Sequence, residues 1–82
     1  MANHESWLAE VIALLARQFS TDADQLCGAT RLVEDLYADS MELLDVVMAL
    51  NEHFGIEINA EDMVRMATVD DIVALVARKS TT

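Results

Sequence analysis

The hydrophobic residues near the start of the chain recur at steps of three and four. This spacing places them on one face of an amphipathic helix, which we expect to cover about residues 5–19. The face consists of Trp7, Leu8, Val11, Ile12, Leu15 and Phe19. Over residues 20–39 the periodicity stops and polar and small residues predominate, which predicts a long loop. Four apolar residues are expected to hold this loop against the core: Leu26, Leu32, Val33 and Leu36.

A second amphipathic helix is predicted to begin at Ser40 and to end near Phe54, with Gly55 after it in the left-handed conformation. At about 100° per residue, one arc of this helix is apolar and should face the core. The arc consists of Leu43, Val46, Val47, Leu50 and Phe54. The opposite side mixes methionines with acids, namely Met41, Asp45, Met48 and Glu52. Such a side offers a partner both apolar contact and charge, although a solvated face with incidental methionines has the same pattern.

Two further helices complete the pattern. Asn59 can cap a short helix over about residues 60–65, and Thr68 can cap a last helix that ends near Arg78. The alternation at residues 56–58 is short, and one strand would have no partner. We therefore predict an all-α fold, a small four-helix bundle with a short third helix and a long loop between helices one and two. The length of 82 residues predicts a single domain, residues 1–82.

Composition narrows the classes of function. Hydrophobic residues make up 54% of the chain, so it should fold despite a formal net charge of −10. The excess of 15 acidic over 5 basic residues disfavours nucleic acids and anionic membranes and favours partners with basic patches. No apolar run approaches the roughly 20 residues of a membrane span, and the polar N-terminus does not resemble a signal peptide. With a single cysteine, Cys27, these features lead us to expect a cytoplasmic protein.

Catalytic and metal-binding residues are not expected. The only histidines are His4 and His53, and no Ser/His/Asp or Cys/His set is apparent. Acidic residues crowd the region around the second helix start, but their order does not fit a calcium-binding EF-hand loop. These residues are Glu34, Asp35, Asp39, Glu42 and Asp45.

Ser40 stands where the acidic loop meets the second helix. The first turn of a helix stabilises anions, so a phosphate carried by this hydroxyl would be well placed. A serine there more often simply caps the helix. The surrounding sequence is Asp35-Leu36-Tyr37-Ala38-Asp39-Ser40-Met41. It resembles the D-L-x-x-D-S-[LM] signature of the acyl carrier protein family, and the resemblance extends over about residues 5–77. Tyr37 departs from the family where glycine is common, and Met41 replaces the commoner leucine.

The resemblance implies a carrier function. Ser40, flanked by Asp39 and Met41, would bear a 4′-phosphopantetheine arm derived from coenzyme A. A separate phosphopantetheinyl transferase would attach the arm, and acyl groups would be held on it as thioesters. Enzymes of the ketosynthase, acyltransferase or acyl-ligase type, with basic docking patches, would then use them. The predicted docking residues are Glu34, Asp35, Met41, Glu42, Leu44, Asp45, Met48 and Glu52.

The resemblance also suggests that the acyl chain folds back between the helices. Its lining would consist of Leu36, Leu43, Val46, Leu50, Ile58 and Met66, although the same six residues can equally fill an ordinary core. The cargo is expected to be acyl rather than aminoacyl, from fatty acid, polyketide or related specialised biosynthesis, and the protein is expected to be a monomer. The alternative is a non-enzymatic acidic helical adaptor that uses the face of Met41 and Met48. Only the carrier interpretation explains the residues that precede the second helix.

Overall fold

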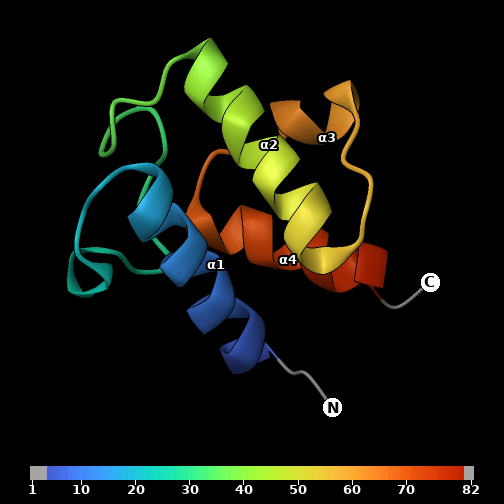
Figure 1. Ribbon diagram of the computed structural model, residues 1–82, viewed down its shortest axis with the longest axis horizontal. Helices are drawn as coiled ribbons and strands as arrows, with labels where there is room; N and C mark the ends of the chain where they lie inside the picture. The colour runs from blue at the N-terminus through green and yellow to red at the C-terminus, as the bar shows by residue number, and fades with distance from the viewer. Residues whose placement is uncertain (1–3, 81–82) are drawn as a thin grey trace.

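The computed structural model describes residues 4–80 and places them in four α-helices and one 3-10 turn (Figure 1). In chain order the elements are α1 (His4–Gln18), η1 (Ala23–Gln25), α2 (Ser40–Phe54), α3 (Ala60–Val64) and α4 (Val69–Ser80). The all-α fold with a short third helix and a long first loop is confirmed, and the helix ends agree with the predicted ends to within two residues. Residues 56–58 lie between α2 and α3 without forming a strand.

The hydrophobic core is built mainly from α1, α2 and α4. α1 packs against both other helices, and Figure 1 shows α4 crossing behind α2. The largest fully buried side chains are Val11, Leu15, Leu32, Val46, Leu50, Val69, Ile72, Val73 and Val76. In α2 the predicted inner arc is confirmed, because Val46, Val47 and Leu50 are buried. Gly55 ends α2 at φ 64° and ψ 38°, as its position predicts.

Among residues 4–80, no helix is long and apolar enough to cross a membrane.

The long loop is attached to the segment that leads into α4. The N–H of Leu32 donates to the carbonyl of Ala67 at 3.0 Å, and the N–H of Val69 donates to the carbonyl of Thr30 at 3.0 Å. Leu26 and Leu32 are buried and Leu36 is half-buried, as expected. The expectation for Val33 was wrong, because its side chain is 52% exposed. The hydrogen bonds that fix Leu32 inward leave its neighbour on the outside.

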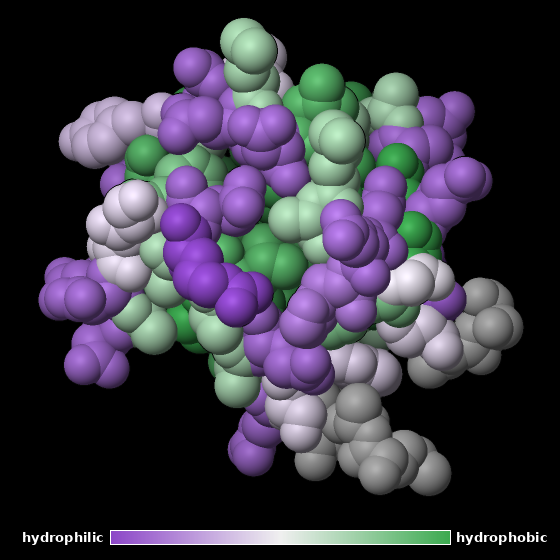
Figure 2. Space-filling model, in the orientation of Figure 1, coloured by the Kyte–Doolittle hydropathy of each residue, from purple (hydrophilic) through white to green (hydrophobic). Residues whose placement is uncertain are grey.

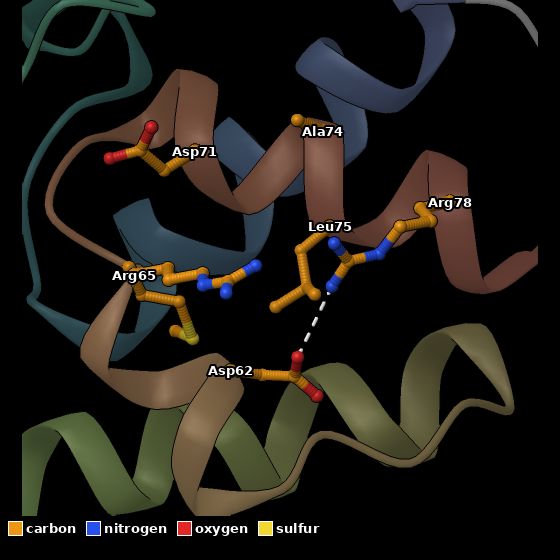
Figure 3. Close-up of a pocket in the computed structure, with 7 residues that line it drawn as sticks. Asp62, Arg65, Asp71, Ala74, Leu75 and Arg78 are labelled. Atoms are coloured by element: carbon orange, nitrogen blue, oxygen red, sulfur yellow. Dashed lines mark hydrogen bonds and ion pairs between the residues drawn. The ribbon is translucent and has the colours of Figure 1, made fainter.

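Asp62 ties the short helix α3 to the end of α4. Its carboxylate accepts a hydrogen bond from the N–H of Asn59 at 3.2 Å, and it pairs with Arg78 at 3.2 Å and Lys79 at 2.8 Å. Figure 3 shows Asp62 and Arg78 pointing toward each other across a pocket of about 270 Å³ between α3 and α4. Because α3 has only five residues, these contacts and the core hold it in place.

Acid should weaken the fold through two carboxylates. The Lys79 ammonium and the Asn59 N–H lower the pKa of Asp62, and the Arg31 N–H and guanidinium lower the pKa of Asp35. A carboxylate whose pKa is lower in the folded state stabilises the fold above its unfolded pKa, and this stabilisation is lost as pH falls through the folded pKa. We therefore expect the free energy of unfolding to decrease from about pH 4 downward.

Urea titrations between about pH 6 and about pH 3 measure this decrease. Asp62→Asn should be less stable than the parent at neutral pH and should lose less stability on acidification. A parent whose stability does not change over this range would contradict the assignment.

Candidate functional site

The start of α2 is held by a reciprocal pair of hydrogen bonds. The Asp39 side chain accepts from the Glu42 N–H at 2.8 Å, and the Glu42 side chain accepts from the Asp39 N–H at 3.3 Å. Asp39 is therefore the N-cap of α2, and Ser40 is its first helical residue. This corrects the interpretation of Ser40 as a capping serine. The Asp-x-x-Glu spacing that produces this capping box is present in the sequence.

The Ser40 side chain is available for chemistry. The residue is exposed, and its hydroxyl makes no hydrogen bond to any other residue in the described range 4–80. The N–H groups of Ser40 and Met41 lie in the first turn, where a helix offers no internal acceptor. An exposed hydroxyl beside unpaired N–H groups fits a covalently attached phosphate.

The acidic residues of the predicted docking surface fall into two groups. Asp35 accepts from the Arg31 N–H at 2.8 Å and pairs with the Arg31 guanidinium at 3.4 Å, while Glu34 lies 4.0 Å from the same guanidinium. Asp45 and Glu52 are exposed and pair with none of the described cations. The unpaired negative charge on this side of the molecule therefore lies on α2, while Arg31 offsets much of the charge on the loop.

Apolar side chains lie among these acids on the outer side of α2. Met41 is 77% exposed and Met48 62% exposed, and Leu44 is also exposed. Glu42 is half-buried in its capping role. Figure 2 shows the same mixture of hydrophilic and hydrophobic areas over the face that it presents. The outer side of α2 thus offers both charge and apolar contact.

Tyr37 has the left-handed backbone conformation, with φ of 57°. The N–H of Ala38 donates to the carbonyl of Leu32 at 3.0 Å, which closes the turn around residue 37. Ala38 is buried and Leu36 is half-buried, so the chain must reverse between them. This geometry explains why glycine suits the position, and a tyrosine there costs about 1–2 kcal/mol in strain. The sequence shows the departure from glycine but not the conformation.

The six residues assigned to an acyl pocket lie in different environments. Val46, Leu50, Ile58 and Met66 are buried, and Leu36 and Leu43 are half-buried. Met66 lines the pocket between α3 and α4, together with Leu75 and charged residues at its rim (Figure 3). A second hollow, between α1 and α2, is lined by none of the six.

Within residues 4–80, no three His, Cys, Asp or Glu side chains come together in a way that would hold a metal ion.

Comparison with known proteins bears on this site. The family described as "Phosphopantetheine attachment site" matches residues 9–76. An acyl carrier protein of Thermotoga maritima is 32% identical over 79 residues, covering 96% of this chain and 98% of the relative. One from Helicobacter hepaticus is 42% identical over 66 residues, covering 80% of this chain and 87% of the relative. The chain belongs to the acyl carrier protein family.

The solved structure of an acyl carrier protein from Enterococcus faecalis supports this membership. It is 30% identical in sequence and superimposes with a TM-score of 0.79, covering 96% of this chain and 100% of the other. As an acyl carrier protein, the chain is a carrier rather than an enzyme, and its cofactor is phosphopantetheine. This decides for the carrier over the acidic adaptor.

Proposed function

We propose that Ser40 carries the 4′-phosphopantetheine arm and that the protein transfers acyl thioesters between enzymes of fatty acid, polyketide or related specialised biosynthesis. The observation that supports this most strongly is the exposed Ser40 hydroxyl, which the capping box leaves without a structural task. Such a carrier would work in the cytoplasm, where its coenzyme A donor is found.

The attachment step requires an external enzyme. The Ser40 oxygen attacks the phosphorus of coenzyme A that bears the pantetheine, the bond to the nucleotide portion breaks, and the serine proton leaves to a base. No histidine is present near Ser40 in the sequence to serve as that base. A phosphopantetheinyl transferase therefore supplies the base and the metal ion, while this chain supplies the positioned hydroxyl.

The charges around Ser40 would direct the arm after attachment. The first-turn N–H groups stabilise the phosphate, while the carboxylates of Asp39 and Glu42 repel it. These opposing effects would keep the phosphate at the helix end and direct the arm outward, where several enzymes can reach its thiol.

The acyl chain can also be assigned a path. Leu43 lies one turn after Ser40 on the inner side of α2, and both Leu43 and Leu36 are half-buried. A chain that folds back from the arm would meet these two side chains before Val46 and Leu50, which fill the core. We extend the proposal to this route, with Ile58 and Met66 at its inner end.

Docking should depend on the unpaired acids of α2. Asp45→Lys places a like charge opposite a basic partner, so we expect the rate of arm attachment to fall about tenfold at low ionic strength. Added salt should reduce this difference, because exposed charges are screened within about 10 Å at 0.1 M. The measurement is the initial rate of attachment with a transferase and labelled coenzyme A.

Glu57→Lys is the matched control for this experiment. Glu57 is exposed and lies beside the last turn of α2, because the N–H of the next residue, Ile58, donates to the Asn51 side chain. Asn51 is about 16 Å from Ser40 along the helix axis, and Glu57→Lys changes the net charge by the same amount as Asp45→Lys. Equal losses in Asp45→Lys and Glu57→Lys would mean that net charge alone governs recognition, and the docking role of α2 would have to be abandoned.

The carrier function itself is tested by the chemistry of the loaded arm. The protein bearing its arm is incubated with an acyl-acid ligase, ATP and a radiolabelled medium-chain fatty acid. We expect label on the protein that neutral hydroxylamine releases, as it does thioesters. Label that resists hydroxylamine, or that protein without the arm acquires equally, would contradict the proposal.

A further inference from the structure

Tyr37 is the most exposed aromatic side chain in the described part of the chain, with 82% of its surface accessible. Its hydroxyl makes no hydrogen bond to another described residue, and its ring belongs to no described aromatic pair. The flanking residues Leu36 and Ala38 are half-buried and buried, whereas the Tyr37 side chain projects into solvent between them. The side chain therefore contributes little to the folded core.

The backbone conformation of Tyr37 also distinguishes this residue. Its φ of 57° lies in the region where a side chain is strained and glycine is not. Because the side chain is exposed, it makes no stabilising contact in the folded state that would offset this strain. Strained residues of this kind are often found at functional sites. The bond from the Ala38 N–H to the Leu32 carbonyl fixes the turn, so the Tyr37 backbone has a defined place from which its side chain projects.

The position of Tyr37 relative to Ser40 indicates which partner would meet it. Tyr37 precedes Ser40 by three residues, in the loop that runs into α2 (Figure 1). Enzymes that use the acyl group can reach it at the end of a long arm. The transferase, in contrast, must bring its own reacting atoms into bonding distance of the Ser40 oxygen, so its surface has to cover the residues immediately around that oxygen.

The charge around Tyr37 indicates the chemistry of the surface that would receive it. Asp39 and Glu42 follow it at the start of α2, while Glu34 and Asp35, which precede it, are paired with Arg31. The unpaired negative charge next to Tyr37 therefore lies on the Ser40 side. A basic surface is complementary to this region, and an arginine in such a surface can stack on the exposed ring. An aromatic side chain projecting from an acidic surface suits an apolar recess with a basic rim.

We propose that Tyr37 is a docking residue for the phosphopantetheinyl transferase, inserting its ring into a basic-rimmed apolar recess next to the transferase active site. The inference rests on the proposed attachment of the arm at Ser40. Tyr37 would add an apolar contact in the loop before Ser40, next to the charged docking surface of α2. Because the ring acts in docking and touches no reacting atom, its loss should change the KM for the carrier and leave kcat unchanged.

The test compares Tyr37→Gly with Ser20→Gly. Ser20 is the other described non-glycine residue with positive φ, at 51°, and it lies in the loop just after α1. Both variants relieve the same kind of backbone strain, so both should melt at or above the temperature of the parent. Steady-state attachment rates are measured with purified transferase and fluorescent coenzyme A at low and high salt.

We expect Tyr37→Gly to raise the KM for the carrier about tenfold, because a buried aromatic contact is lost. This effect should persist at high salt, and Ser20→Gly should behave like the parent. An unchanged KM in Tyr37→Gly, an equal loss in Ser20→Gly, or a loss confined to kcat would each overturn the inference while leaving Ser40 as the attachment site. A parent protein that gains no arm at all would overturn the proposed function together with it.

Discussion

Replacing Ser40 with alanine is expected to abolish attachment of phosphopantetheine and to leave the fold intact. No other hydroxyl side chain lies at the start of α2, so the loss of attachment should be complete. The fold should survive because Asp39, and not Ser40, caps the helix, and alanine is a good helix former at a first-turn position. We expect the melting temperature of Ser40→Ala to stay within a few degrees of the parent.

Intact-protein mass spectrometry after incubation with coenzyme A and transferase measures the loss, and circular dichroism measures the melting temperature. Ser80→Ala is the matched control, since Ser80 lies at the end of α4 and should be irrelevant to attachment. Attachment to Ser40→Ala would refute the assignment of the serine. A melting temperature lowered by about ten degrees would show that the Ser40 side chain does contribute to the fold, contrary to the assignment of Asp39 as the cap.

A large loss of stability is expected from Leu32→Ala. Leu32 is fully buried although it lies in the long loop, and its N–H bonds the Ala67 carbonyl. Truncating a buried leucine to alanine typically costs about 2–5 kcal/mol. In a chain of this size the cost corresponds to a melting temperature lower by about 10 °C or more. Because the Leu32 side chain anchors the turn that the Ala38 N–H closes on the Leu32 carbonyl, the loop leading to Ser40 should loosen first.

The neighbouring Val33→Ala provides the control, because Val33 is about half exposed and its truncation should change stability by less than about 0.5 kcal/mol. Urea denaturation of the two variants gives the comparison. Similar losses in both variants, or no loss in Leu32→Ala, would show that the loop is not anchored through Leu32.

The helices can be predicted from the sequence because their information is local. In α2 the apolar spacing defines the inner arc, and Gly55 marks the end of the helix. The attachment motif is likewise continuous in sequence, so the amino-acid order alone is enough to show its resemblance to the family. The family comparison and the fold agree with these predictions.

The remaining features depend on contacts between distant segments. The ion pair from Asp62 to Arg78 joins residues on two different helices. The backbone hydrogen bonds of Thr30 and Leu32 join the long loop to the segment at the start of α4. No local pattern specifies such pairings, which is why the inward turn of Leu32 and the outward turn of Val33 cannot be told apart from the sequence. The capping role of Asp39 can be predicted from its spacing to Glu42, but serine is an equally favoured N-cap residue, so residue type alone does not decide between Asp39 and Ser40.

Attachment of the arm at Ser40 is measured directly by fragment mass spectrometry of the modified parent protein. The protein is incubated with coenzyme A and a phosphopantetheinyl transferase, digested, and the fragments are sequenced in the mass spectrometer. We predict a single phosphopantetheine per chain, on the fragment and at the residue that correspond to Ser40. No added arm, or an arm on Ser6, Ser20 or Ser80, would contradict Ser40 as the attachment site.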